Sequence, residues 1–123
     1  RGTEGPFERY GHPDFPKMDF SFTPESGPGS KDPKYKNVLC YGYNMGEVER
    51  RETRFELNFL LNSNLLLKGK TFIDRPDMFK LLSGNDELME QLKNGTSEEA
   101  IRASWQEKLD AFKLMRAKYL LYE

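Results

Sequence analysis

Residues 18–44, MDFSFTPESGPGSKDPKYKNVLCYGYN, carry the strand–loop–strand pattern that decides the fold class. Apolar and polar residues alternate over Met18–Thr23, which predicts a strand because successive side chains of a strand point to opposite faces. The stretch 25–36 is rich in glycine, serine and proline and predicts a long turn region. Val38–Asn44 predicts a second strand, and we expect Leu39–Asn44 to complete a small antiparallel sheet with the first.

Residues 1–16 predict an ordered loop. Pro6, Pro13 and Pro16 lack the N–H group that a sheet ladder needs, and three glycines in the same stretch permit unusual dihedral angles. Large aromatic side chains stand at positions 7, 10 and 15. We therefore expect this loop to be pinned against another part of the protein.

The second half of the chain has a different composition. Fourteen of the 15 leucines come from Leu57 onward, whereas the whole chain has two valines and two isoleucines. Leucine favours helices and β-branched residues favour strands. The predicted fold class is therefore α+β: a small antiparallel sheet with aromatic-rich strands and long loops, covered by C-terminal helices. These helices are expected to begin near Phe55, Pro76, Asp86 and Ser97.

Local signals predict where the helices begin and end. Helical spacing extends over Phe55–Leu67, and Asn85 or Asp86 is expected to cap the third helix. Glycine after a helix commonly ends it, and the expected stops are Gly69, Gly84 and Gly95. The charged stretch Glu47–Glu52 between the two halves predicts a solvated loop.

The last helix has the strongest pattern. Thr96–Glu99, TSEE, predicts a capping box with Thr96 at the N-cap and Glu99 three residues later. Apolar residues then recur at steps of three and four residues, at Ile101, Trp105, Leu109, Phe112, Met115 and Tyr119. We expect this stripe to face the core with Trp105 buried, and the apolar end YLLYE, 119–123, to dock as well.

Composition and charge exclude several classes of function. Nineteen basic and twenty acidic residues give a net charge of -1, so nucleic-acid binding has no bulk electrostatic support. No apolar run is long enough for a transmembrane helix. One cysteine, Cys40, and one histidine, His12, make no zinc-binding pattern, so we expect no metal and no cofactor. The chain begins at Arg1 rather than methionine, and we expect it to be processed or cut from a longer protein.

A few residues have side chains suited to chemistry. Glu4 and Asp14 are carboxylates among aromatic residues, as in a sugar-hydrolysing site, although in so charged a chain they also fit as surface acids. Arg1 opens an Arg-Gly-Thr segment that can bind a carboxylate through its guanidinium fork, unless this end is frayed. Cys40 is expected to be a buried structural residue, and His12 to be structural or exposed.

Four segments together resemble one family. RGTEGPFERYGHPDF (1–15), FSFTPESGPGS (20–30), CYGYNM (40–45) and the tail 83–123 are similar to the second half of bacterial peptidoglycan exo-β-N-acetylmuramidases, the NamZ-like glycoside hydrolases. The resemblance covers most of the chain and is thin between residues 46 and 75. No one of these segments is decisive, but four in the right order are specific to the family.

The resemblance implies a two-domain enzyme. Residues 1–123 would be its C-terminal α+β domain and form one wall of an inter-domain cleft, with an upstream Rossmann-like domain that this chain lacks. Such an enzyme releases N-acetylmuramic acid from the non-reducing end of peptidoglycan fragments, in the periplasm or elsewhere outside the cytoplasm. We expect the main catalytic acid in the missing domain, so that the isolated chain would be inactive.

The same resemblance directs attention to five substrate-binding candidates. Arg1 would bind the lactyl carboxylate that distinguishes N-acetylmuramic acid, and Thr3 would bind a hydroxyl group. Glu4 is a weaker candidate for substrate binding, for holding Arg1, or for catalysis. Tyr41 and Tyr43 would form a stacking wall for the sugar. The alternative is a non-catalytic module that binds glycan or a partner domain; a helical adaptor is disfavoured by the proline- and aromatic-rich first half.

Overall fold

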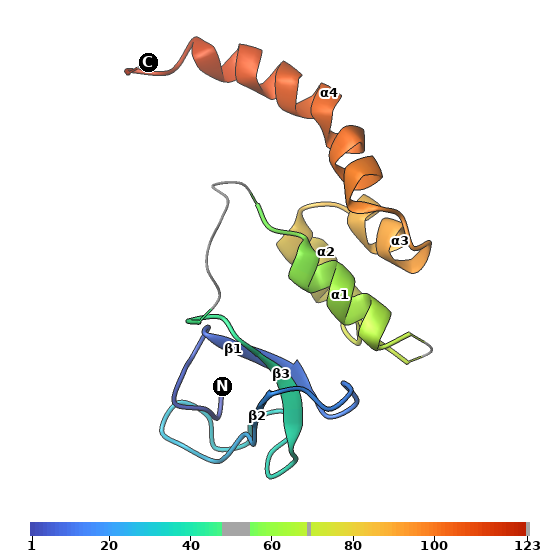
Figure 1. Ribbon diagram of the computed structural model, residues 1–123. Helices are drawn as coiled ribbons and strands as arrows, with labels where there is room; N and C mark the ends of the chain where they lie inside the picture. Colours follow the sequence, from blue (N-terminus) through green and yellow to red (C-terminus); the bar gives the residue numbers. More distant parts are fainter. Residues whose placement is uncertain (48–54, 69, 123) are drawn as a thin grey trace. The chain divides into compact units, whose positions relative to one another are not determined.

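The computed structural model describes residues 1–47, 55–68 and 70–122. The described elements, drawn in Figure 1, are three strands, β1 (Arg9–His12), β2 (Phe20–Phe22) and β3 (Cys40–Asn44), and four helices, α1 (Asn58–Leu66), α2 (Pro76–Ser83), α3 (Glu87–Lys93) and α4 (Glu98–Ala117). The predicted α+β class is confirmed. The predicted loop Glu47–Glu52 lies outside the described residues except for Glu47. The predicted helix stop, Gly69, also lies outside them.

The chain forms two compact units. The first unit comprises Arg1–Glu56 and Leu65–Lys70 and contains the sheet. The second comprises Leu57–Asn64 and Thr71–Glu123 and contains α2, α3, α4 and most of α1.

The sheet has the order β1-β3-β2, and both pairs are antiparallel. Strands β2 and β3 lie within the two ranges predicted from the sequence. The expectation of a loop over residues 1–16 is wrong for Arg9–His12, which forms β1 and pairs along its whole length with residues 41–44 of β3. The nearest prolines, Pro6 and Pro13, flank this strand and so cost it no ladder hydrogen bond.

Two glycines allow β1 and β3 to approach closely. Gly11 lies opposite Gly42 in the ladder. A Cβ atom on Gly42 would collide with the carbonyl oxygen of Tyr10 and lie 2.6 Å from the Cα atom of Gly11. A Cβ atom on Gly11 would collide with the carbonyl oxygen of Tyr41 and lie 2.9 Å from the ring of Phe22. The position of β1 in the sheet therefore depends on the absence of side chains at both positions.

The register gives the sheet two different faces, because directly opposed residues of antiparallel strands share a face. One face carries Tyr10, His12, Ser21, Tyr41 and Tyr43. Tyr10 and Tyr43 stack there with ring centroids 5.1 Å apart. The other face carries Arg9, Gly11, Phe20, Phe22, Cys40, Gly42 and Asn44. Cys40 is buried, as expected, and burial raises the pKa of its thiol, so that it stays protonated.

The second unit has a small aliphatic core. Leu57, Leu88, Leu92 and Ile101 are buried together, with Phe79 and Trp105 among the partly buried side chains packed against them. The predicted helices are confirmed within a few residues at each end. Gly84 ends α2 in the left-handed region at φ 78°, as its sequence position predicts.

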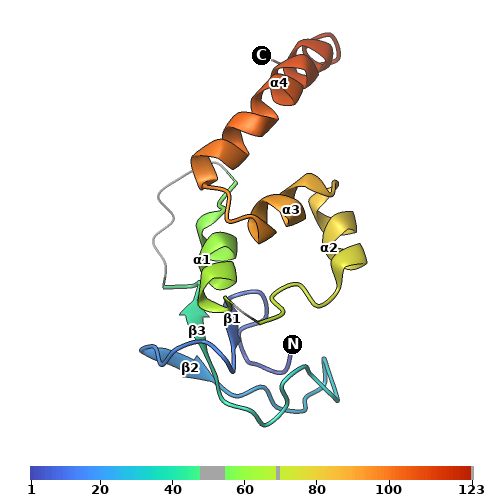
Figure 2. The same ribbon diagram turned by 90° about the vertical axis from the view of Figure 1, so that its right-hand side faces the viewer.

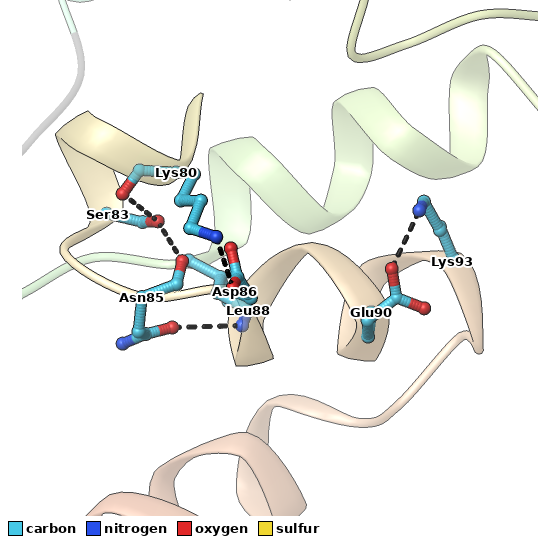
Figure 3. A network of polar contacts seen from close by, with 7 residues as sticks. All are labelled: Lys80, Ser83, Asn85, Asp86, Leu88, Glu90 and Lys93. Atoms are coloured by element: carbon cyan, nitrogen blue, oxygen red, sulfur yellow. Dashed lines mark hydrogen bonds and ion pairs between the residues drawn. The ribbon is translucent and has the colours of Figure 1, made fainter. Parts of the chain in front are cut away.

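Polar side chains hold the turn between α2 and α3 (Figure 3). The hydroxyl of Ser83 donates to the carbonyl oxygen of Asn85 at 2.8 Å. The side-chain oxygen of Asn85 accepts the N–H of Leu88 at 3.3 Å, which caps the start of α3. Lys80 and Asp86 form an ion pair across the same turn at 2.5 Å. Of the two caps expected from the sequence, Asn85 makes the side-chain contact.

The predicted capping box of α4 is wrong by one residue. Ser97, not Thr96, is the N-cap, with extended dihedral angles, and its hydroxyl oxygen accepts the N–H of Ala100 at 3.3 Å. Ala100 occupies the position three residues after the N-cap, where a capping box has glutamate or glutamine. No carboxylate at that position therefore returns a hydrogen bond to the cap. The pattern of residue types fits only Thr96, which has Glu99 three residues later, but the helix begins one residue further on and uses the hydroxyl of Ser97.

The expectation that the whole stripe of α4 faces the core is also wrong. Ile101 is buried and Trp105 is partly buried against the core, but Phe112 is 50% exposed and Met115 is 55% exposed. The apolar end does not dock either, since Leu121 is 89% exposed. Periodicity predicts which residues share a face, but it cannot predict how far along the helix another element covers that face. None of the described helices is long and apolar enough to span a membrane.

Gly42→Ala should destabilise the protein by about 3 kcal/mol, the upper end of the range for overpacking, because the added methyl group meets backbone rather than a movable side chain. Urea denaturation measures the change. Gly27→Ala is the matched control, since a Cβ atom there meets nothing within 4 Å. Equal losses in the two variants would show that β1 and β3 do not need this close approach.

Leu92→Ala should cost about 2–5 kcal/mol of unfolding free energy, because it removes a buried side chain from the core of the second unit. Leu114→Ala makes the same chemical change on α4, where the side chain is 75% exposed, and should cost less than about 0.5 kcal/mol. The free energy of unfolding of both variants, measured by urea denaturation, tests this prediction. A large loss from Leu114→Ala would mean that this part of α4 is covered in solution.

Candidate functional site

A pocket of about 680 Å³ lies in the first unit, between the start of the chain and the loop that follows β2. One wall is built from Arg1, Gly2, Thr3, Glu4, Pro6 and Arg9, and the other from the six residues Glu25–Ser30. This volume is typical of small-molecule sites. Three of the five substrate-binding residues predicted from the sequence, Arg1, Thr3 and Glu4, are therefore brought together.

Gly2 joins the two walls. Its carbonyl oxygen accepts the N–H of Glu25 at 2.8 Å. Its backbone is in the left-handed region at φ 76°, and a Cβ atom would lie 2.6 Å from the ring of Pro33. A side chain here would therefore be strained and would push the segment away. Figure 2 shows the N-terminus beside the loop that follows β2, so the start of the chain is held rather than frayed.

The second wall is an ordered turn. Gly27 and Ser30 exchange two backbone hydrogen bonds, of 3.0 and 3.1 Å, around Pro28 and Gly29. The hydroxyl of Ser26 donates to the carbonyl oxygen of Lys31 at 2.8 Å and fixes the base of the turn. The glycine- and proline-rich stretch that predicted a turn therefore forms a defined surface of the pocket.

The pocket contains two guanidinium groups. Within the described part of the chain, neither Arg1 nor Arg9 forms an ion pair, although Glu4 and Glu25 also line the pocket. The side chain of Arg1 is exposed. The guanidinium carbon of Arg9 lies 5.9 Å from the ring centroid of Phe20, within the range of a cation–π contact. Two cations without carboxylate partners suit an anionic ligand.

Two charged residues of the pocket, Arg9 and Glu25, were not among the residues predicted from the sequence. A Cβ atom on Gly5 would lie 2.9 Å from the Nε atom of Arg9, so this side chain is held between the Gly5 backbone and the Phe20 ring. No local pattern marked this position, because the four residues of β1, RYGH, show no apolar alternation. Had Arg9–His12 been recognised as a strand, its register would have placed Arg9 on the same face as Phe20.

Tyr41 and Tyr43, the predicted stacking wall, are not among the residues that line this pocket. They lie on the face of the sheet opposite Arg9, where Tyr43 stacks on Tyr10. A role for them in binding the same ligand as Arg1 stays a prediction without geometric support.

Asp14 lies outside the pocket, in an ion pair. Its carboxylate is 2.8 Å from the Nζ atom of Lys70, and this hydrogen bond holds the pKa of Asp14 below its ordinary value. A general acid needs a raised pKa, so Asp14 is poorly suited to protonate a leaving group. Among the described residues, no cluster of three or more His, Cys, Asp or Glu side chains could hold a metal ion.

The comparisons with known proteins agree with the resemblance seen in the sequence. A family model described as "Exo-beta-N-acetylmuramidase NamZ, C-terminal" matches residues 1–122. The chain belongs to this family. The resemblance to NamZ-like proteins that its four segments predicted is confirmed. No curated protein gives a match.

A solved structure supports the membership. The crystal structure of a DUF1343 family protein from Bacteroides fragilis NCTC 9343 is similar with a TM-score of 0.85 and 36% sequence identity. The match covers 100% of this chain and 35% of that chain. This chain therefore spans about a third of the length of that protein.

Proposed function

We propose that this chain is the C-terminal, substrate-binding domain of an exo-β-N-acetylmuramidase. In this proposal the intact protein releases N-acetylmuramic acid from the non-reducing end of peptidoglycan fragments, outside the cytoplasm. An upstream Rossmann-like domain supplies the main catalytic acid, and this chain forms one wall of the cleft between the two domains. Membership of the NamZ C-terminal family supports the reaction class.

One observation supports the role of this chain in particular: the pocket holds Arg1 and Arg9 without an ion-pair partner among the described residues. N-acetylmuramic acid differs from N-acetylglucosamine by a lactyl ether that ends in a carboxylate. A planar guanidinium group binds a carboxylate through two parallel hydrogen bonds. The sugar that carries the extra anion is therefore the one that this pocket would select.

The other groups of the pocket suit the rest of the sugar. The hydroxyl of Thr3 can donate to or accept from a sugar hydroxyl. The carboxylates of Glu4 and Glu25 can accept hydrogen bonds from sugar hydroxyl groups, and they disfavour a second anion nearby. In this proposal Glu4 binds substrate and is not the catalytic acid.

In the intact protein, Arg1→Ala should lower kcat/KM on a muramic-acid-terminated disaccharide by about 10- to 100-fold, the effect of losing a hydrogen bond to a charged group worth about 1.5–3 kcal/mol. Arg1→Lys should recover part of the loss, because the charge remains but the fork does not. The release of N-acetylmuramic acid is the measurement. Lys31→Ala is the control, since this exposed lysine adjoins the second wall but does not line the pocket.

Reducing the lactyl carboxylate to an alcohol separates anion binding from a structural role. If Arg1 binds the carboxylate, wild type and Arg1→Ala should have the same kcat/KM on the reduced substrate. Equal impairment of Arg1→Ala on both substrates would contradict the proposal. Binding without any hydrolysis by the intact protein would favour the alternative, a non-catalytic glycan-binding module.

A further inference from the structure

His12 lies outside the pocket but is bonded to the loop that forms one of its walls. It is the last residue of β1, and its Nε2 atom is 2.6 Å from the hydroxyl oxygen of Tyr35, 23 positions later in the chain. The two rings meet edge to face, with centroids 4.8 Å apart at 78°. This contact joins the sheet to the segment between β2 and β3, which contains the second wall.

The backbone of Asp14 determines which atom of the His12 ring carries the proton. The N–H of Asp14 donates to Nδ1 of His12 at 3.0 Å, so Nδ1 must be an acceptor. The neutral ring therefore carries its proton on Nε2 and donates it to the hydroxyl oxygen of Tyr35. The bond in the native protein therefore runs from Nε2 of His12 to the hydroxyl oxygen of Tyr35.

The segment around Tyr35 has an unfavourable backbone conformation. Tyr35 and Asn37 both have φ 59°, in the left-handed region that non-glycine residues rarely adopt. Such conformations persist where the surroundings hold them in place. Here the N–H of Asn37 donates to the carbonyl oxygen of Pro24 at 2.8 Å, and the hydroxyl of Tyr35 accepts from His12.

The same segment supports the pocket. Pro33, two residues before Tyr35, is buried, and its ring lies against Gly2. The N–H of Lys36 donates to the carbonyl oxygen of Pro33 at 3.1 Å and closes the turn between them. A continuous series of contacts thus connects His12 with Tyr35, Pro33 and Gly2, where the two walls of the pocket meet.

We propose that His12 and Tyr35 are positioning residues, which together hold the loop 24–37 so that its part 25–30 forms the second wall of the pocket. The pair does not touch the ligand. This assignment concerns the shape of the pocket, and it rests on the proposed function only where N-acetylmuramic acid is taken as the ligand.

The first test is amide hydrogen exchange in the intact protein with Tyr35→Phe, which removes the hydroxyl and keeps the ring. The amide of Glu25, bonded to Gly2, should exchange about 3- to 10-fold faster, the equivalent of one hydrogen bond. The amide of Met45, bonded to Glu8 beside the β1–β3 ladder, should be unchanged. Tyr119→Phe is the matched control, because it removes a hydroxyl from a tyrosine that is 79% exposed.

Replacement of His12 tests whether a hydrogen bond to Tyr35, rather than the imidazole ring itself, holds the wall. His12→Gln keeps an N–H donor within reach of Tyr35 and should restore much of the protection at Glu25 that His12→Ala loses. Unchanged exchange at Glu25 in Tyr35→Phe would overturn the proposal. Equally faster exchange at Glu25 and Met45 would also overturn it, because the pair would then stabilise the whole unit rather than the wall.

The second test uses N-acetylmuramic acid as the ligand probe. Tyr35→Phe should raise its Kd for the intact protein by about the same 3- to 10-fold. An unchanged Kd beside faster exchange at Glu25 would show that the wall does not shape the binding site, and would overturn the positioning role. If wild type does not bind N-acetylmuramic acid at all, the proposed function fails, and the exchange experiment still decides the role of His12 and Tyr35.

Discussion

The close approach of β1 and β3 at Gly11 and Gly42 is the constraint on which the candidate site depends. These residues face each other without side chains, and a methyl group on either would meet the backbone of the neighbouring strand. With β1 in the sheet, Arg9 comes to lie over Phe20, and the residues before it reach the loop that follows β2. The pocket is therefore a consequence of a third strand that pairs where two glycines allow it.

The loop between β2 and β3 is long, yet it is fixed at several points. Gly27 and Ser30 close its turn, Pro24 accepts a hydrogen bond from its far end, and Tyr35 is bonded to His12. Most of these contacts use backbone groups, so the shape of the wall depends on local conformation more than on the identity of exposed side chains. The guanidinium group of Arg9, near the ring of Phe20, therefore lies beside a surface of defined shape. A site that is formed in advance in this way lowers the entropy lost when a ligand binds.

Much of the fold could be predicted from local patterns. Alternation predicted β2 and β3, and leucine content and glycine stops predicted the helices of the second unit. Strand β1 could not be found in this way, because its four residues, RYGH, show no apolar alternation and stand among prolines. Its existence depends on long-range pairing with β3. The length of α4 that packs on the core could not be predicted for a similar reason. A side chain is buried only where another element covers it, and the spacing of apolar residues along one helix does not show where that element ends.

The candidate site was predicted in part. Arg1, Thr3 and Glu4 are neighbours in sequence, so local reasoning could group them, whereas Arg9 joins them only through the register of β1. Tyr41 and Tyr43 were grouped with them by residue type, but the register places their side chains on the other face of the sheet. Residue type therefore indicated the kind of chemistry, and pairing across the sheet determined which residues share a site.

The central claim is that the pocket between residues 1–9 and 25–30 receives the carboxylate of N-acetylmuramic acid. A crystal structure of the intact protein with N-acetylmuramic acid bound tests it most directly. The account predicts the lactyl carboxylate within hydrogen-bond distance of the guanidinium group of Arg1 or Arg9. A sugar bound elsewhere, or in this pocket with its carboxylate directed away from both arginines, would contradict it.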